Sequence, residues 1–468
     1  MTARILAIDI GTSSTKGLLV DDRGQIQATH QVCYPLLSPQ PDYAEQDPSQ
    51  ILAAVREVIE RVAPRGVDIV FGCAMHSVIP VDVIGAALSP MLTWADRRAT
   101  RIASELRTED RARGLHARTG TPIHPMSPLC KIRHISRHDT DLFYRVDRFV
   151  SIKEFVIEAL TGERCVDHSV ASSTGLFDVA RLQWDPEALE FAGIDAGRLS
   201  PLVPTTHVID DPGSKRRIVV GATDGVLANL GAGDADATAL CVTLGTSGAA
   251  RLLVDGPMTD PEGRLFCYVL DAGRWVIGGA INNGGLVLGW LQNEFPDEAR
   301  THDEIITRAS NVVAGADGLL CVPAVAGERY PTYDPRAVVT LSGGREARTP
   351  DLTMRAALEG MMLPFAPLID EVEEASGAGP FEEVRIGGGV FEWEFCRQLL
   401  ADVIGRRVAM SDSRESSALG GARLGFQALG VDHGWSHETT FSHTPDSDAH
   451  AVYRRLLGRR DDLARPVR

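Results

Sequence analysis

A short turn rich in glycine and hydroxyl residues occurs twice in this 468-residue chain, about half a chain length apart. The first copy, at 10–13, reads Ile-Gly-Thr-Ser, and the second, at 244–247, reads Leu-Gly-Thr-Ser; a Leu-Leu-Val-Asp segment follows each of them. Each turn lies between two apolar runs of strand length, which predicts a β-hairpin. We interpret the two copies as one supersecondary unit used once in each half, and chance similarity of two short turns is the alternative.

Strand-like and helix-like segments alternate along the rest of the chain, which predicts an α/β fold. Strand character is found at 4–9, 68–74, 217–221 and 384–386. Helical periodicity is found at 48–63, 99–115, 151–161, 353–376, 391–404, 416–428 and 448–464, and from about 225. A domain boundary is expected near residue 234, which gives domains over 1–234 and 235–430 and a polar, histidine-rich tail over 431–468.

Composition narrows the class of function. The formal net charge is −16 and there is no basic run of five residues, so nucleic acid and anionic membranes are not expected as partners. The eight cysteines form no C-x-x-C pair, which indicates neither a zinc site nor a disulfide scaffold and favours a cytoplasmic location. The uncharged stretch 275–293 contains Asn282, Asn283 and Gln292, which makes it a poor membrane helix.

Lysine is rare among the 47 basic residues. The four lysines are Lys16, Lys131, Lys153 and Lys215, and all the others are arginine. Coding bias in a GC-rich genome is one interpretation of this imbalance. A lysine that persists is nevertheless a candidate for a role that the wide fork of arginine cannot fill.

Both glycine–hydroxyl turns suit the binding of phosphate, because small residues let backbone N–H groups approach an anion and the hydroxyls add donors. Lys16 follows the first turn and could meet a phosphate as a compact charge. Asp9, at the end of the preceding strand, could lie near a magnesium ion through water. One such turn is explained equally well by a plain hairpin with an exposed lysine, but two turns favour a nucleotide held between the halves. Neither the P-loop nor the G-x-G-x-x-G consensus is present.

Four further segments lie at strand ends or in turns and have a possible role in a binding site. Asp224 precedes a helix, so it is either an N-cap or a general base that accepts a proton from a substrate hydroxyl. Residues 75–77 (Met-His-Ser) end the strand at 68–74, and 94–98 (Trp-Ala-Asp-Arg-Arg) offers an aromatic ring, an acid and two guanidinium groups. The triple glycine at 387–389 lets backbone approach adenine or ribose, or makes a tight strand-to-helix connection. Structural and functional interpretations stay open for each of these segments.

Taken together, these motifs resemble the FGGY carbohydrate kinases over residues 4–430. The similar segments, in the family's order, are 9–16, 221–225, 243–248, 327–335, 355–360, 387–389 and 418–422. The resemblance implies two actin-like ATPase (ribonuclease H-like) domains around a central cleft, the first binding sugar and carrying the catalytic aspartate and the second binding nucleotide. The chain departs from the family at His134, where tryptophan is usual, and at 391–393 (Phe-Glu-Trp), which leaves the nucleotide base preference open.

Within that family, residues 75–77, 94–96, 119–128, 151–154 and 222–229 most resemble gluconokinases, whereas xylulokinases share the Met-His pair. The resemblance therefore implies ATP-dependent phosphorylation of a sugar or sugar acid, with D-gluconate as the expected substrate. Phosphorylation of xylulose or another ketose or polyol is the alternative. An actin-like ATP-binding regulator without catalysis is the alternative from a different class. The oligomeric state is left open, a homodimer included.

The resemblance also implies a role for each candidate site residue. Asp224 is the expected catalytic base; the sugar contacts are Met75, His76, Ser77 and Asp96; the nucleotide and phosphate contacts are Thr12, Ser13, Lys16, Thr246, Gly285 and Gly389; and magnesium lies near Asp9 and Asp224. A gluconate carboxylate needs a cation in an acidic protein, and the candidates are Arg97, Lys153 and His124.

Overall fold

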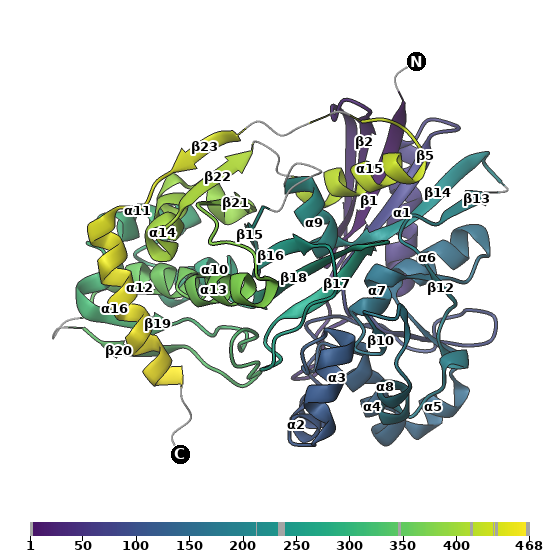
Figure 1. Cartoon of the computed structure of the whole chain (residues 1–468), viewed down its shortest axis with the longest axis horizontal. Coiled ribbons are helices and arrows are strands. Elements are labelled where there is room, and N and C mark those ends of the chain that lie inside the picture. Colours follow the sequence, from purple (N-terminus) through teal and green to yellow (C-terminus); the bar gives the residue numbers. More distant parts are fainter. Residues whose placement is uncertain are drawn as a thin grey trace. The chain divides into compact units, whose positions relative to one another are not determined.

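The computed structural model describes residues 3–211, 213–232, 239–344, 348–411, 415–433, 435 and 439–464 (Figure 1). The described residues form two compact units, and each unit collects segments that are far apart in the sequence. The first unit draws on Met1–Ala237, Leu253–Ile277 and Glu415–Ser436, and the second on Thr238–Leu252, Gly278–Arg414 and His437–Arg468. The boundary expected near residue 234 lies outside the described residues, so the domain ranges stay a prediction.

The first sheet has six strands in the order β13-β14-β5-β1-β2-β3. Their bounds are β1 Arg4–Ile10, β2 Ser14–Asp21, β3 Ile26–Cys33, β5 Asp68–Cys73, β13 Val208–Asp211 and β14 Arg216–Thr223. Strands β1 and β2 form the first predicted hairpin, in which Asp9 lies opposite Lys16. Strands β5 and β14 continue the sheet in parallel, so the carboxyl ends of β1, β5 and β14 lie at the same edge.

Helices cover both faces of this sheet, as the near-continuous apolar run of β1 requires. Ile5 and Ala7 lie in one apolar cluster with Ala422 of α15 (Ser416–Ala428). The other face meets α1 (Pro48–Val62), where Val58 fills the space beside a glycine of β2. Figure 1 shows α15 lying across β1 and β5, although more than 330 residues separate them in the sequence.

The second sheet has seven strands in the order β17-β18-β16-β15-β21-β22-β23. Their bounds are β15 Cys241–Leu244, β16 Gly248–Val254, β17 Phe266–Asp271, β18 Arg274–Ile281, β21 Glu383–Gly387, β22 Arg407–Ser411 and β23 Thr439–His443. From β16 to β23 the pairings run antiparallel, parallel, parallel and antiparallel. The first sheet shows the same run from β2 to β13. The predicted duplication of one supersecondary unit is therefore confirmed.

The other helices are α2 Thr100–Arg107, α3 Arg111–Thr119, α4 Pro128–His138, α5 Thr140–Arg145, α6 Ile152–Thr161, α7 His168–Ser172, α8 Pro186–Ala192, α9 Asp224–Ala232, α10 Leu286–Glu294, α11 His302–Ser310, α12 Pro350–Met362, α13 Phe365–Ser376, α14 Glu394–Ile404 and α16 Ser447–Ala464. The short strands are β4 Glu45–Gln46, β6 Ile79–Val81, β7 Met91–Leu92, β8 Arg148–Val150, β9 Val166–Asp167, β10 Phe177–Asp178, β11 Gln183–Trp184, β12 Leu202–Val203, β19 Leu319–Val322 and β20 Thr340–Gly343. Among these described helices, none combines the length and the apolar character needed to cross a bilayer.

Two helices expected as single segments are each divided in the structure. The segment at 99–115 is broken after α2, where the Thr108 hydroxyl donates to the carbonyl of Glu105 and offers the chain an alternative to helical bonding. The segment at 353–376 is broken at Pro364, which has no N–H to donate and which caps α13. The periodicity identified the helical faces but could not locate these breaks.

Helices α9 and α15 cross at a very short distance, which brings the start of α15 to the functional edge of the first sheet. A Cβ on Gly420 would lie 1.9 Å from the carbonyl oxygen of Leu227 in α9. Only glycine permits this approach. Gly420, the first glycine of the Gly-Gly pair in α15, thus has a packing reason. The close approach of the two helices brings Glu415, which precedes α15, to the neighbourhood of Lys16.

Candidate active site

Two carboxylates meet where β1 and β14 end on either side of β5. Asp9 of β1 and Ala222 of β14 are both register partners of Gly72 in β5. Gly72 is closely packed against α9, because a Cβ there would lie 2.9 Å from a side-chain carbon of Leu227. Asp224 follows two residues after Ala222, as the first residue of α9. The structure therefore brings together the two acids that the sequence predicts at the magnesium and base positions.

Asp9 has an unusual electrostatic environment for a carboxylate. Burial, followed by the negative charges of Asp224 and Glu415, raises its pKa to about 7, and the charge of Lys16 opposes that rise. Its Oδ1 atom is buried and accepts no hydrogen bond from any described residue. A buried acceptor without a donor among the described residues is of the kind that a cation can satisfy.

The position of Asp224 is fixed by a bulge in β14 and by a hydroxyl clamp. The register of β14 against β5 shifts between Val219 and Ala222, and Gly221 within this bulge has a φ of +75°. Ser169 accepts the N–H of Thr223 at 3.1 Å, and the two hydroxyls are 3.0 Å apart. Asp224 Oδ1 accepts the N–H of Gly225 at 2.7 Å. The carboxylate of Asp224 thus lies at the N-terminus of α9. The residue before it, Thr223, is fixed at the end of β14 by the Ser169 hydroxyl.

Lys16 is engaged by an acid that sequence reasoning missed. Its Nζ lies 2.5 Å from Glu415 Oε1, and about 30% of each side chain is exposed. The two residues are 399 positions apart, so neither spacing nor periodicity could pair them. A phosphate that reached Lys16 would meet this carboxylate as well, and the predicted contact between Lys16 and phosphate stays a prediction.

The first turn is anchored through Thr12. Trp94 Nε1 donates to Thr12 Oγ1 at 2.9 Å, and the side chain of Gln46 donates to the Thr12 carbonyl at 2.7 Å. The Ser13 carbonyl accepts the N–H of Tyr34 at 3.1 Å, and the Ser13 side chain is exposed. Trp94, which the sequence suggests as an aromatic platform, therefore contacts the first glycine–hydroxyl turn directly.

The predicted sugar-contacting segment, Met75 to Ser77, is held in a strained conformation. His76 has a φ of +66°, which is uncommon for a residue with a side chain. Its Nδ1 donates to the carbonyl of Ser173 at 2.7 Å, and Ser77 Oγ accepts the N–H of Ile152 at 3.1 Å. His76 and Ser77 are buried and Met75 is half-buried. Strain that neighbouring contacts maintain in this way is typical of functional loops.

Asp96 is occupied by protein donors. It is fully buried, both of its oxygens bind the Arg98 guanidinium at 2.8 and 2.9 Å, and Oδ2 also accepts the N–H of Ala44 at 2.9 Å. This arrangement fixes the loop after Trp94, and a direct contact between Asp96 and a sugar stays a prediction.

Two of the three candidates for a carboxylate-binding cation are inaccessible. Lys153 is 1% exposed and its Nζ lies 2.8 Å from Asp167 in a closed, buried pair. His124 is buried. Arg97 is 39% exposed and lies 3.1 Å from the half-exposed Asp42, so it is the candidate that a substrate carboxylate could reach.

The second turn, in the other unit, gathers the predicted nucleotide residues. The N–H of Gly285, at the start of α10, donates to the Gly245 carbonyl at 2.6 Å, and the Thr246 carbonyl accepts the next backbone N–H at 3.3 Å. Gly388 passes so close to β15 that a Cβ would lie 2.5 Å from a backbone oxygen, whereas a Cβ on Gly389 would meet nothing within 4 Å. The exposed Thr246 side chain, the start of α10 and the open side of the triple glycine thus lie at one edge of the second sheet.

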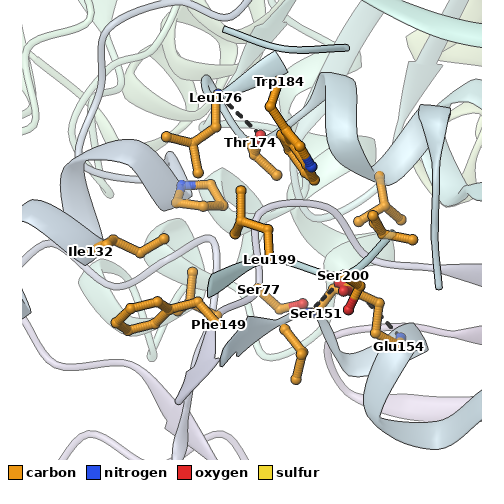
Figure 2. A pocket seen from close by; sticks show the side chains of 15 residues that line it. Ser77, Ile132, Phe149, Ser151, Glu154, Thr174, Leu176, Trp184, Leu199 and Ser200 are labelled. Atoms are coloured by element: carbon orange, nitrogen blue, oxygen red, sulfur yellow. Dashed lines mark hydrogen bonds between the residues drawn. The ribbon is translucent and has the colours of Figure 1, made fainter. Parts of the chain in front are cut away.

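A small cavity of about 20 Å³ lies behind Ser77 in the first unit (Figure 2). Figure 2 shows Ser77, Ser151, Glu154 and Ser200 gathered on one side of it and apolar side chains on the other. A space of this size holds about one water molecule. It is far smaller than pockets for small metabolites, which are on the order of 300 Å³ or more, so this cavity is not the substrate site.

Glu154, which lines this cavity, predicts a pH dependence of stability. Burial raises its pKa to about 7, although the N–H of Ser151 and the hydroxyls of Ser151 and Ser200 favour the ionised form. A raised pKa favours the protonated folded state, so this contribution is present below about pH 4.5 and is lost as the pH rises through about 7. Relative to Glu154→Gln, the wild type should lose up to about 3 kcal/mol of unfolding free energy across that range, measured by urea titration at several pH values. The control is Glu190→Gln, because the Glu190 side chain is exposed. If the unfolding free energies of the wild type and Glu154→Gln depend on pH in the same way, the prediction is contradicted.

The N-terminal domain model of the FGGY family of carbohydrate kinases matches residues 4–241, and the C-terminal domain model matches residues 240–429. The chain belongs to the FGGY family of carbohydrate kinases. FGGY kinases transfer a phosphoryl group from ATP, so the predicted enzyme class and the predicted use of ATP are confirmed.

Individual FGGY kinases support this assignment over nearly the whole chain. Gluconokinase of Bacillus subtilis (strain 168) is 37% identical, covering 98% of this chain and 94% of that protein. Xylulose kinase of Escherichia coli (strain K12) is 26% identical, covering 96% of each chain. The crystal structure of gluconate kinase from Lactobacillus acidophilus has a TM-score of 0.91 at 27% identity and covers 99% of this chain and 98% of that one. The predicted two-domain, actin-like α/β fold is thereby confirmed.

Proposed function

We propose that this FGGY kinase phosphorylates D-gluconate, and that Asp224 is the catalytic base. The single observation that carries the base assignment is the meeting of Asp224 and Asp9 at the sheet edge beside the first phosphate turn. Asp224 accepts the proton of the sugar hydroxyl while that oxygen attacks the γ-phosphorus of ATP. The bond from the γ-phosphorus to the bridging oxygen breaks, and ADP leaves. Phosphoryl transfer of this kind needs positioning and charge stabilisation more than covalent chemistry from the protein.

Asp9 and Asp224 would hold a magnesium ion, partly through water. The buried Asp9 Oδ1, which lacks a donor among the described residues, fits such an ion. The described residues include no group of three or more His, Cys, Asp or Glu suited to a metal. This agrees with an ion that keeps several waters and takes few protein ligands. When bound, magnesium supplies positive charge to the phosphate oxygens.

Two observations favour gluconate over a neutral ketose as the proposed substrate. The relatives named gluconokinase share 37% and 36% identity with this chain, whereas the xylulose kinases share 26% to 28%. Arg97 also offers an accessible cation next to the Trp94–Asp96 segment. A non-catalytic ATP-binding regulator is less well supported, because the base position holds Asp224 and the relatives that are 37% and 36% identical are named as enzymes.

A coupled ADP-release assay tests the substrate assignment. Gluconate, xylulose, ribulose and glycerol are compared at equal ATP, and gluconate should give the highest kcat/KM. Arg97→Met should lower kcat/KM for gluconate about tenfold or more while changing that for neutral polyols little, because one exposed ionic contact to the carboxylate is lost. A higher kcat/KM for xylulose than for gluconate would replace this proposal with the ketose kinase alternative.

A further inference from the structure

Lys131 of α4 has its charged end inside the first unit and is completely buried. Its Nζ donates to the carbonyl of His76 at 2.7 Å and to the carbonyl of Thr93 at 2.6 Å. Burial lowers its pKa to about 7, while the charge of Asp96 favours the protonated form. Burying an amine costs free energy unless hydrogen bonds compensate for the lost water, and the two carbonyls provide these hydrogen bonds.

The two carbonyls that Lys131 joins belong to the two segments predicted to contact the sugar. His76 is the strained residue of the Met75–Ser77 segment, and Thr93 begins the turn that leads through Trp94 to Asp96. The Thr93 carbonyl also accepts the N–H of Asp96 at 3.1 Å. Two backbone hydrogen bonds between Val78 and Leu92, at 3.0 and 2.9 Å, already join these segments on the strand side. Lys131 adds a side-chain link at nearby residues, where the two chains enter their loops.

We propose that Lys131 is a positioning residue for the sugar, a bracket that holds the left-handed His76 and the Thr93–Asp96 turn at the spacing that the substrate requires. This inference rests on the proposed function, because it assumes that these segments bind the sugar. It is carried by the two hydrogen bonds, the complete burial of the side chain and the strained φ of His76.

The bracket also explains why lysine is kept at this position in a chain that otherwise uses arginine. A compact ammonium on a flexible stem can point at two carbonyls from inside a packed core. The ammonium has three N–H groups, two of which these carbonyls accept, whereas the wider planar guanidinium has five. An arginine here would bury more unsatisfied donors, which is costly. Arginine should therefore not substitute for Lys131.

The test compares the kinetic constants of Lys131→Met with those of the wild type. Methionine has a side chain of similar length and removes both hydrogen bonds. We expect KM for gluconate to rise about 10- to 100-fold, because small displacements of positioning groups have effects of that size, while KM for ATP stays unchanged. Lys131→Arg should behave like Lys131→Met. A folded Lys131→Met enzyme with an unchanged KM for gluconate, or one in which both KM values rise in proportion, would overturn the inference.

Two controls separate positioning from loss of stability. Leu189→Ala weakens the same apolar cluster that packs around α4 and should lower the melting temperature without changing either KM. Lys215→Met removes an exposed lysine and should change nothing. If Lys131→Met does not fold, Lys131→Gln keeps two N–H donors on a shorter side chain. Gluconate should then raise the melting temperature of Lys131→Gln less than that of the wild type, while ATP raises both equally, and equal shifts with gluconate would refute the bracket.

Failure of the inference and failure of the proposed function give different results. If the wild-type enzyme does not phosphorylate gluconate, the function is wrong, and the same variants are measured with the sugar that the substrate panel identifies. If the wild type phosphorylates gluconate and the Lys131 variants bind it normally, only the bracket is wrong.

Discussion

Replacing Asp224 with asparagine is expected to lower kcat by about 10²- to 10⁴-fold, the range that a positioned general base contributes. Asparagine preserves the size of the side chain and its hydrogen bond from the N–H of Gly225, so the start of α9 should stay intact. The amide cannot accept the proton of the sugar hydroxyl. Initial rates at saturating gluconate and ATP give kcat, and KM for ATP should change little.

The matched control for this prediction is Asp210→Asn. Asp210 lies on β13 of the same sheet and is exposed, so the same loss of charge is made away from the site. Its kcat should equal that of the wild type. Near-normal turnover in Asp224→Asn would remove Asp224 from the role of base, whatever the overall fold.

Replacing Gly221 with alanine is expected to disrupt the first unit at the point that positions Asp224. A Cβ there would lie 1.8 Å from the backbone oxygen of Phe71, and no side-chain rotation can relieve a clash with backbone. The bulge of β14 would have to open, with a loss of about 4 kcal/mol or more of unfolding free energy. Denaturant unfolding measures this loss, and kcat should fall with it because the carboxylate of Asp224 moves.

Gly66→Ala separates the steric clash from the cost of the backbone conformation. Gly66 also has a positive φ, +79°, but a Cβ there would meet nothing within 4 Å. Its replacement should cost only about 1–2 kcal/mol and leave kcat unchanged. If Gly221→Ala is no more destabilising than Gly66→Ala, the bulge does not hold Asp224 as described.

Local patterns in the sequence were sufficient for much of the fold and for part of the site. The alternation of apolar runs located β1, β5 and β14, and the two glycine–hydroxyl turns identified the duplicated hairpins. These inferences depend on periodicity and turn chemistry, which act over a few residues. The placing of Asp9 near Asp224 comes instead from the resemblance to FGGY kinases, and the structure gives its physical reason, since β1 and β14 end at the same edge of the sheet.

Contacts between distant parts of the chain could not be predicted in the same way. Glu415 pairs with Lys16 only because a glycine of α15 lets that helix approach α9. The rarity of lysine draws attention to Lys131, but nothing in the sequence identifies the two carbonyls, of His76 and Thr93, that its Nζ contacts. Strand β23 was missed because four of its five residues are exposed, and a strand at the edge of a sheet shows little apolar alternation.

The product formed from ¹³C-labelled gluconate and ATP is the most direct evidence for or against this account. Phosphorus coupling in the carbon spectrum identifies the oxygen that carries the phosphate. The wild type should yield one product phosphorylated on the C6 oxygen together with an equal amount of ADP, and Asp224→Asn should yield neither at a comparable rate. Release of ADP and inorganic phosphate with gluconate left unmodified would contradict the account.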